Sequence, residues 1–259
     1  MVEQPQAKLM ADADEPLVLV GPPRGIRGEF RLQNPTSDKV IVREPRFLPA
    51  APSGRSKVAL ASAAIPESQL VMRRIIMRPG QSRPVPVALT LDRRTRPGTY
   101  HAQLEINGQQ RTVVIHVTEE VSLAIAPEEI VLPHAPGEKI KKRIVFTNDG
   151  NTPISVRSLG TVVLDEELVH CRALRGALAE AGDTTESIDD FFVVLARRYK
   201  KLYETLVLKV QNTAVTIEPG ETEAVDLTIT LPEKLEPRSR YSGYAAISTS
   251  NLYFTIVPE

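Results

Sequence analysis

One short pattern in the sequence has residue types and spacing that could bind a metal ion. Glu167 and His170 stand three positions apart, which would place both side chains on one face of a helix. A di-iron site of the helical-bundle type needs two Glu-x-x-His motifs and further glutamates from facing helices. The following helix-like segment has no second motif. We therefore interpret the acidic residues here as favourable charges at a helix N-terminus and predict no metal site.

The residues that could supply a nucleophile or a base form no catalytic arrangement. His170 and Cys171 are neighbours, so on a helix they point to different faces. Cys171 falls on an apolar stripe, where a cysteine is usually a small buried hydrophobe. The sequence has no Gly-x-Ser-x-Gly, and the glycine-rich stretch 21–28 lacks the lysine of a phosphate-binding loop. We predict no catalytic residue, no cofactor and no enzymatic activity.

Length and composition are those of a folded chain of one large or two medium domains. The chain has 259 residues, of which 42% are hydrophobic and 25% charged. A single cysteine cannot form an internal disulfide. No apolar run is long enough for a membrane-spanning helix, so we expect no direct membrane insertion. Aromatic residues make up 5% and tryptophan is absent, so we expect neither a carbohydrate nor another small-molecule ligand.

A net charge of zero conceals two halves of opposite charge. Residues 1–118 hold 17 Lys and Arg against 10 Asp and Glu (net +7), and residues 119–259 hold 15 against 22 (net −7). The basic side chains form either a solvated surface or a patch for an acidic partner, with Arg93, Arg94 and Arg96 as predicted contacts. Few aromatic residues are interleaved for base stacking, so we expect no nucleic acid. The predicted basic surface of the first half rests mainly on ten arginines: Arg24, Arg27, Arg31, Arg73, Arg74, Arg78, Arg83, Arg93, Arg94 and Arg96.

The two halves are related by an internal repeat. Each half contains an alternating apolar run, an asparagine at a turn, and a second alternating run. A Pro-Gly turn follows in each half, and a tyrosine opens a late strand 20 residues after the turn glycine in the first half and 21 residues after it in the second. Agreement at three anchors indicates a true repeat. The anchors are Asn34 and Asn148, Gly80 and Gly220, and Tyr100 and Tyr241.

Each half is predicted to be an antiparallel sandwich of about seven short strands, because turn signals recur about every 8–12 residues. Asn107-Gly108, between two alternating runs, is a strong hairpin signal. The predicted domains are a flexible tail at 1–15, a basic sandwich at 16–118 with a mobile loop at 48–66, and an acidic sandwich at 119–259.

The turn asparagine, the Pro-Gly turn and the tyrosine before the closing hairpin together resemble bacterial immunoglobulin-like domains, in both halves. Two such domains in a chain of this length also resemble the periplasmic pilus-chaperone family, most closely at FRLQNPTSDKVIV and MRPGQSRPVPVAL. The resemblance implies an all-β fold of two tandem immunoglobulin-like antiparallel β-sandwiches. It also implies a basic pair that anchors a subunit's carboxylate between the domains, and an edge strand that pairs with the subunit. No flanking motif assigns that basic pair to particular arginines here.

The second half carries an insertion with helical periodicity. Its turn asparagine and turn glycine are 72 residues apart, against 46 in the first half. The extra residues fall at about 164–204, where the apolar period changes from 2 to 3.6, and they predict a helical hairpin. The first predicted helix, residues 165–181, has one apolar stripe: Leu168, Cys171, Leu174 and Leu178.

The second predicted helix, residues 187–204, has its own apolar stripe, with acidic residues early and basic residues late as the helix dipole favours. We favour burial of both stripes against the sheet and each other. The alternative is a docking surface for a partner, with Phe191, Phe192 and Tyr199 as predicted contacts.

The sequence favours a non-catalytic accessory or structural subunit that binds other proteins through sheet edges, the arginine-rich face or the helical insertion. The alternative is a periplasmic pilus-type assembly chaperone that donates an edge strand to its clients. Residues 1–15 lack the basic and apolar regions of a signal peptide. We expect a cytoplasmic chain if Met1 is the native start, and an extracytoplasmic or periplasmic one if a leader has been removed.

Overall fold

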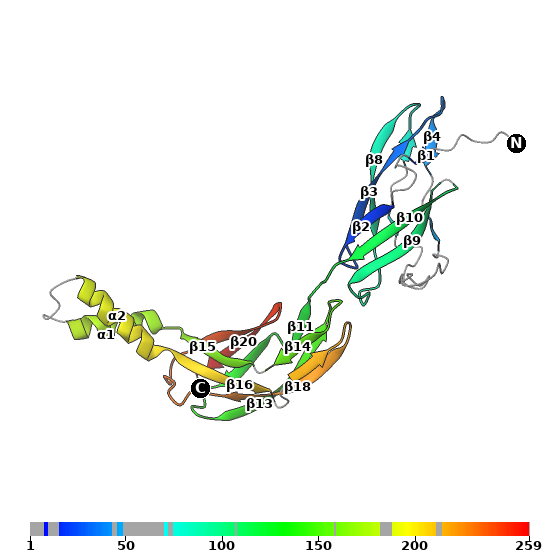
Figure 1. Ribbon diagram of the computed structural model, residues 1–259. Coiled ribbons are helices and arrows are strands. Elements are labelled where there is room, and N and C mark those ends of the chain that lie inside the picture. The colour runs from blue at the N-terminus through cyan, green and yellow to red at the C-terminus, as the bar shows by residue number, and fades with distance from the viewer. Residues whose placement is uncertain are drawn as a thin grey trace. The chain divides into compact units, whose positions relative to one another are not determined.

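The computed structural model describes residues 8–9, 16–42, 46–48, 70–71, 75–106, 108–157, 159–181, 188–210 and 214–258. The chain divides into two compact units. Unit 1 comprises Met1–Glu120 and Gly150–Thr152, and unit 2 comprises Val121–Asp149 and Pro153–Glu259. Both units are built from β-strands, and unit 2 alone contains helices among the described residues, so the predicted all-β class with a helical insertion is confirmed (Figure 1).

Unit 1 is a β-sandwich. Its main sheet has the order β5-β9-β10-β2-β3-β8-β6, with β1 also paired to β3, and β4 forms a separate ribbon with β7. The strands are β1 (Lys8–Leu9), β2 (Leu17–Gly21), β3 (Ile26–Gln33), β4 (Val40–Val42), β5 (Arg46–Leu48), β6 (Leu70–Val71), β7 (Ile75–Met77), β8 (Ser82–Leu89), β9 (Gly98–Ile106) and β10 (Gln109–Val117).

Unit 2 has the strand order β11-β13-β18-β16-β15-β19-β20-β12, with β14 and β17 forming a separate ribbon. The strands are β11 (Leu123–Ala126), β12 (Glu129–Pro133), β13 (Lys139–Asn148), β14 (Ile154–Arg157), β15 (Gly160–Glu166), β16 (Glu204–Val210), β17 (Ala214–Ile217), β18 (Thr222–Thr230), β19 (Tyr241–Ile247) and β20 (Ser250–Val257). The helices, α1 (Val169–Ala181) and α2 (Ile188–Leu202), lie between β15 and β16.

The predicted repeat is visible in the strand pairing. Every pairing of unit 1 except that of β2 with β3 recurs in unit 2 between the strands ten places later. For example, β10 pairs with β2 in parallel, and β20 pairs with β12 in parallel. The chief addition in unit 2 is the pairing of β15 with β16. These are the two strands that the helical hairpin connects.

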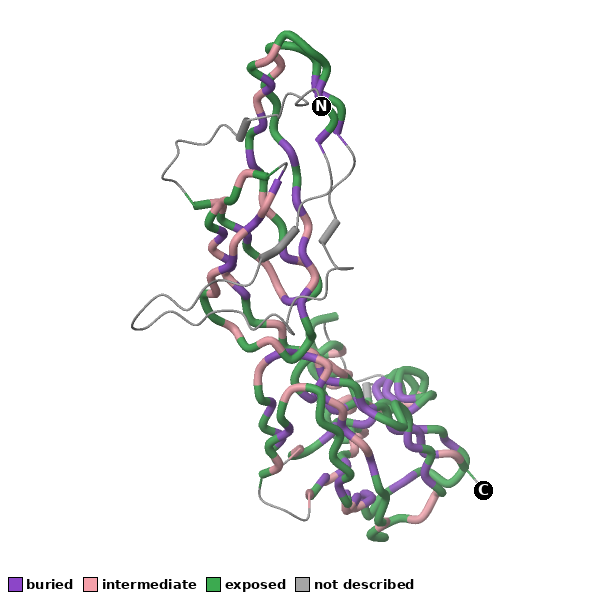
Figure 2. The backbone as a smooth tube through the Cα atoms, turned by 90° about the vertical axis from the view of Figure 1, so that its right-hand side faces the viewer, coloured by how far each residue is buried: buried purple, intermediate pink, exposed green. Residues whose placement is uncertain are grey.

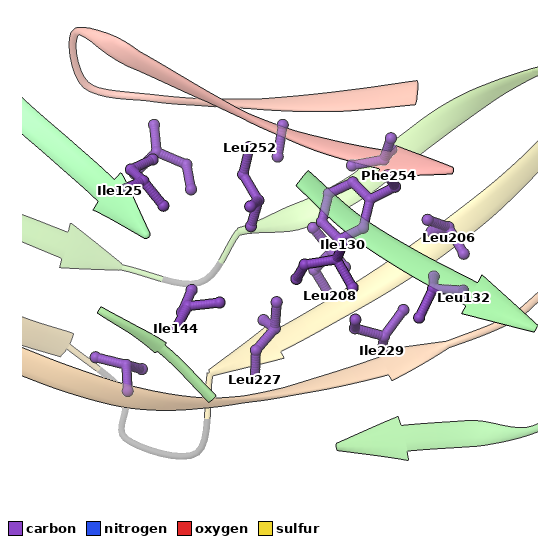
Figure 3. Packing of buried hydrophobic residues seen from close by; sticks show 14 of the residues in the cluster. Ile125, Ile130, Leu132, Ile144, Leu206, Leu208, Leu227, Ile229, Leu252 and Phe254 are labelled. Carbon is purple, nitrogen blue, oxygen red and sulfur yellow. The ribbon is translucent and has the colours of Figure 1, made fainter. Parts of the chain in front are cut away.

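The two cores arise from alternation along the strands, because successive side chains point to opposite faces. In β10, Val113, Ile115 and Val117 are buried while their neighbours are exposed or half-buried, and Figure 2 shows this alternation along the backbone. Each unit has its own cluster of buried apolar residues. In unit 2, side chains of β12, β16, β18 and β20 converge on Phe254 (Figure 3). No residue of α1 or α2 belongs to that cluster.

The two turn asparagines have matching roles. Asn34 and Asn148 are fully buried, and each carbonyl accepts the backbone N–H of the turn glycine of its own unit, at 2.9 and 2.8 Å. The side-chain amide of Asn148 donates to the carbonyl of Ile217 at 2.9 Å, and that of Asn34 donates to the carbonyl of Met77 at 3.3 Å. Each asparagine therefore stabilises its Pro-Gly turn.

The two anchor tyrosines also play one role. Each sits near the start of a late strand and bonds to the backbone a few residues upstream, as the tyrosine corner of immunoglobulin-like domains does. The hydroxyl of Tyr100 donates to the carbonyl of Arg96 at 2.8 Å, and that of Tyr241 accepts the N–H of Glu236 at 2.7 Å. Burial raises the pKa of both phenols.

Several predictions fall outside the described residues. Only Lys8 and Leu9 of the tail at 1–15 are described, and of the loop at 48–66 only Leu48, in β5, is described. Asn107 of the predicted hairpin turn is also outside, although β9 and β10 pair on either side of it. The first helix begins at Val169 rather than 165, because Asp165 and Glu166 extend β15 to pair with β19.

Candidate protein-binding surface

The helical hairpin extends from one end of the β15–β16 strand pair, which belongs to the eight-stranded sheet of unit 2. Strands β15 and β16 pair from Gly160 opposite Leu208 to Leu164 opposite Glu204. The helices continue beyond that end, and Figure 1 shows them clear of the faces of the sheets. The predicted helical hairpin is confirmed, whereas the expected burial of its helices against the sheet is wrong.

A buried carboxylate joins the first turn of α1 to the sandwich. The side chain of Glu166 is 1% exposed, and Nη1 of Arg172 lies 2.8 Å from each of its oxygens. The hydroxyl of Ser239 donates to the same carboxylate at 2.8 Å. Arg172 also lies 3.3 Å from Glu236. The hydrogen bond to Glu166 raises the pKa of the Arg172 guanidinium.

This network is not among the features predicted from the sequence, although a signal for it is present. Glu166 follows Val162 and Leu164 at a period of two, and all three are buried. A carboxylate at a core-facing position requires a charged or hydrogen-bonding partner. Its partner Arg172 is six residues further on, across the start of α1. Sequence periodicity does not identify a partner at that spacing.

The seam between the two helices is narrow and built from small residues of α1. Val169, Ala173 and Ala177 are buried and recur every four residues, the spacing of one helix face. No described residue of α2 is fully buried. At the far end of the seam, Nε of Arg198 donates to the carboxylate of Glu180 at 2.6 Å. Small side chains and polar contacts therefore hold the helices together.

The predicted contact residues of α2 lie in different environments. Phe192 is 57% exposed and Phe191 is half-buried, and their rings meet edge to face with centroids 5.9 Å apart. Tyr199 is also half-buried, and its hydroxyl lies 2.8 Å from Nδ1 of His170. Tyr199 therefore joins α2 to α1, whereas Phe192 is presented to solvent.

The apolar stripe of α1 is exposed. Leu168, Leu174 and Leu178 are 50%, 46% and 58% exposed, and Cys171 is exposed as well. The expected burial of this stripe, and of the cysteine in particular, is wrong. At 100° per residue, with Leu168 counted as the position before α1, the stripe is centred about 155° around the helix from the seam residues. Only small side chains fit the seam, so the leucines lie outside it. We call these four residues the α1 stripe.

The three predicted arginine contacts lie in the loop between β8 and β9. Arg93, Arg94 and Arg96 are exposed. Two side chains hold the backbone of the loop: the N–H of Arg94 donates to a carboxylate oxygen of Asp92 at 2.8 Å, and the carbonyl of Arg96 accepts the Tyr100 hydroxyl. The loop therefore presents the three arginines at one end of unit 1.

The described arginines do not form a single face. The turn bearing Arg24 adjoins the β8–β9 loop, because the N–H of Leu91 donates to the carbonyl of Pro23 at 2.7 Å. Arg31 and Arg83 lie toward the other end of the β3–β8 pair. Arg73 and Arg74 are outside the described residues.

The described residues contain no arrangement for metal chemistry or membrane crossing. No group of three or more His, Cys, Asp or Glu side chains among them lies close enough together to hold a metal ion. His170, of the Glu-x-x-His pattern, contacts Tyr199 instead. Neither α1 nor α2 is long and apolar enough to cross a membrane.

Unit 2 has an exposed aromatic pair that is not among the features predicted from the sequence. Tyr244 of β19 lies opposite Tyr253 of β20, with ring centroids 6.1 Å apart. Counted from the anchor tyrosines, the equivalent residues of unit 1 are Gln103 and Thr112, which also lie opposite each other. The fold therefore does not require aromatic residues here. A residue-by-residue alignment of the two halves would have found the pair.

Two long strands of unit 1, β10 and β8, lie inside a sheet order that ends at β5 and β6. Strand β10 lies between β9 and β2 over Val113–Val117. Strand β8 pairs with β6 only at Leu89 and Ala88, and the rest of β8 contains Pro84 and Pro86. Proline lacks the N–H that an added strand would use, so alternate prolines block an edge.

Comparison with known proteins gives a resemblance at the level of fold. No protein-family model and no curated protein matches the sequence. The CupB2 chaperone of Pseudomonas aeruginosa is 7% identical, over 95% of this chain and 99% of that one, with a TM-score of 0.28. The class 5 fimbriae chaperone CfaA is 11% identical, over 98% and 100%, with a TM-score of 0.27. Two titin domains crystallised with telethonin are 11% identical, over 100% and 98%, with a TM-score of 0.26.

The resemblance predicted from the sequence, to tandem immunoglobulin-like domains and pilus chaperones, thus recurs among solved structures. At these identities and TM-scores it assigns no function.

Proposed function

We propose that this chain is a non-catalytic subunit that binds another protein through the α1 stripe. The observation that carries the proposal is the exposure of Leu168, Leu174 and Leu178 on the side of α1 away from its seam with α2. Single exposed leucines are common on protein surfaces. A row of them on an element that supplies nothing to the core is typical of an interaction surface.

The α1 stripe offers a partner substantial binding free energy. Fully burying one leucine is worth about 1.5–3 kcal/mol, and each of the three leucines is about half exposed. Covering all three would therefore contribute about 3 kcal/mol. That amount corresponds to a factor of roughly 100 in affinity.

An amphipathic helix of the partner protein suits the α1 stripe best. From Leu168 to Leu178 the stripe runs about 15 Å along the helix axis, a length that three turns of a partner helix would cover. The alternative of a pilus-type chaperone requires an open edge strand. Strand β10 is flanked on both sides over Val113–Val117, and β8 carries two prolines, so neither of these two long strands offers a client an open edge.

The test compares complexes isolated from the native source with wild-type protein and with the double variant Leu174→Glu/Leu178→Glu. A buried carboxylate is costly, so the variant should lose a stoichiometric partner that the wild type retains in native mass spectrometry. Ala179→Glu is the matched control, because it adds the same side chain to an exposed position of α1 outside the stripe.

Both variants should unfold at the wild-type temperature, since neither changes a buried residue. A partner that stays bound to the double variant would contradict the proposal. A client that binds only transiently and leaves a monomer would favour the chaperone instead.

A further inference from the structure

Helix α2 presents a second exposed stripe, different in composition from the α1 stripe. Asp189, Val193, Ala196 and Lys200 are all exposed and recur at intervals of four, three and four residues. That spacing is the a/d seam of a coiled coil. Phe192, which is 57% exposed, flanks the seam. We call these five residues the α2 stripe.

The α2 stripe is complementary to itself. It has an acid at its start, a base at its end, and apolar side chains between them. Suppose that two copies pack antiparallel about a two-fold axis between Val193 and Ala196. Asp189 of each copy then lies opposite Lys200 of the other, and each Val193 lies opposite the smaller Ala196.

The charges also select the direction of packing. In a parallel pair, Asp189 would meet Asp189 and Lys200 would meet Lys200, and like charges at these positions are destabilising. Two further charges of α2 follow the same order along the helix, because Asp190 lies in the first turn and Lys201 in the last.

We propose that the α2 stripe binds the α2 stripe of a second copy of this chain, as an antiparallel two-helix coiled coil. This contact uses a different helix face from the α1 stripe, so it does not depend on the proposed function. The resulting dimer carries two α1 stripes. A partner with two binding sites would therefore bind it with avidity.

The contact is small, and the dimer is expected to be weak. A helix of 15 residues is about 22 Å long. One pair of such helices buries less than the roughly 1,600 Å² of a standard interface. We expect added salt to weaken the dimer further, because the end contacts are exposed charge pairs.

The experiment is a charge exchange followed by sedimentation equilibrium of the purified full chain at low and at physiological salt. Asp189→Lys and Lys200→Asp each place like charges opposite one another twice per dimer, and each should weaken dimerisation about tenfold or more. The double variant Asp189→Lys/Lys200→Asp restores opposite charges and should recover most of the wild-type affinity.

The control variant is Leu174→Glu/Leu178→Glu, which should dimerise like the wild type even though it tests the proposed function. Circular dichroism checks that each variant keeps its helices. A wild type that stays monomeric at millimolar concentration would overturn the proposal. A dimer that is indifferent to both single exchanges, or is not recovered by the double exchange, would overturn it as well.

Discussion

The carboxylate of Glu166 lies in the wall of the unit 2 sandwich, where an unpaired charge would be expensive. It has three hydrogen bonds, two from Arg172 and one from Ser239. Removing one partner of such a pair leaves the other buried and uncompensated, which costs more than the pair contributes when intact. This network makes the position of α1 depend on a few side chains.

Arg172→Met should lower the free energy of unfolding of unit 2 by about 2 kcal/mol, because Ser239 alone would then compensate the buried carboxylate. The double variant Glu166→Met/Arg172→Met should recover most of the loss, since it removes the charge as well as its partner. Urea unfolding measures both. A single variant as stable as the wild type would show that Glu166 needs no counter-charge.

The anchor tyrosines predict a loss of stability at high pH. Burial raises the pKa of Tyr100 and Tyr241, whereas the unfolded value is about 10. The folded state therefore holds these phenol protons more tightly. The contribution of these phenols to the free energy of unfolding is complete below about pH 10. It is lost as the pH rises through the raised folded-state pKa values.

Urea unfolding from about pH 8 to 11 tests this prediction. The free energy of unfolding should fall above about pH 10, and less steeply in Tyr100→Phe/Tyr241→Phe than in the wild type. The control is Tyr203→Phe/Tyr244→Phe, which removes two exposed tyrosines and should leave the slope unchanged. If the free energy of unfolding fell equally steeply with pH in all three proteins, Tyr100 and Tyr241 would not be the cause of the loss.

At the scale of elements, the helical hairpin is an addition to the sandwich rather than part of its core. Its seam uses Val169, Ala173 and Ala177, and the cluster of buried residues in unit 2 contains neither helix. Strands β15 and β16 are adjacent and antiparallel, so a short turn could connect them in place of the hairpin. The hairpin should therefore be removable.

Replacing residues 167–201 with Asn-Gly, together with Glu166→Leu, should leave unit 2 folded. Asn-Gly closes a two-residue hairpin between paired strands, and leucine fills the core-facing position without a charge. Thermal unfolding should remain cooperative, while dimerisation and partner binding should both be lost. A molten or unfolded unit 2 would show that the hairpin is part of the core after all.

The hairpin also shows what sequence patterns can and cannot predict. The change of period from 2 to 3.6 predicts both helices, and their boundaries lie within a few residues of those observed. The same pattern places Leu174 and Leu178 on one face but does not say what covers that face. Burial is the default prediction for such a face, and it is wrong here because Ala173 and Ala177 form the seam. The Glu166–Arg172 pair escaped prediction because it depends on how α1 leaves β15.

At the scale of the whole molecule, one chain contains the same fold twice. The anchors were predictable because each depends on local chemistry: a buried turn asparagine, a Pro-Gly turn and a corner tyrosine. Where equivalent positions of the two units carry different residues, the fold does not require a particular residue at that position. Tyr244 and Tyr253 are such positions, because unit 1 has Gln103 and Thr112 in their place.

Tyr244→Gln/Tyr253→Thr, which copies the residues of unit 1, should change the free energy of unfolding by less than about 1 kcal/mol, the size of a cross-strand pair. The reciprocal variant, Gln103→Tyr/Thr112→Tyr, should likewise fold. Urea unfolding of both variants measures the effect. A large loss in the first would mean that the tyrosine pair supports unit 2 in a way that unit 1 does not need.

The central claim, that the α1 stripe binds a partner, can be tested most directly with the only cysteine of the chain. Cys171 lies on the α1 stripe and is exposed, so its rate of maleimide labelling reports whether the stripe is covered. We predict labelling at the rate of a free thiol in the isolated protein and at least about tenfold slower labelling in its native complex. Equal rates in the isolated protein and in a stoichiometric complex would contradict the claim.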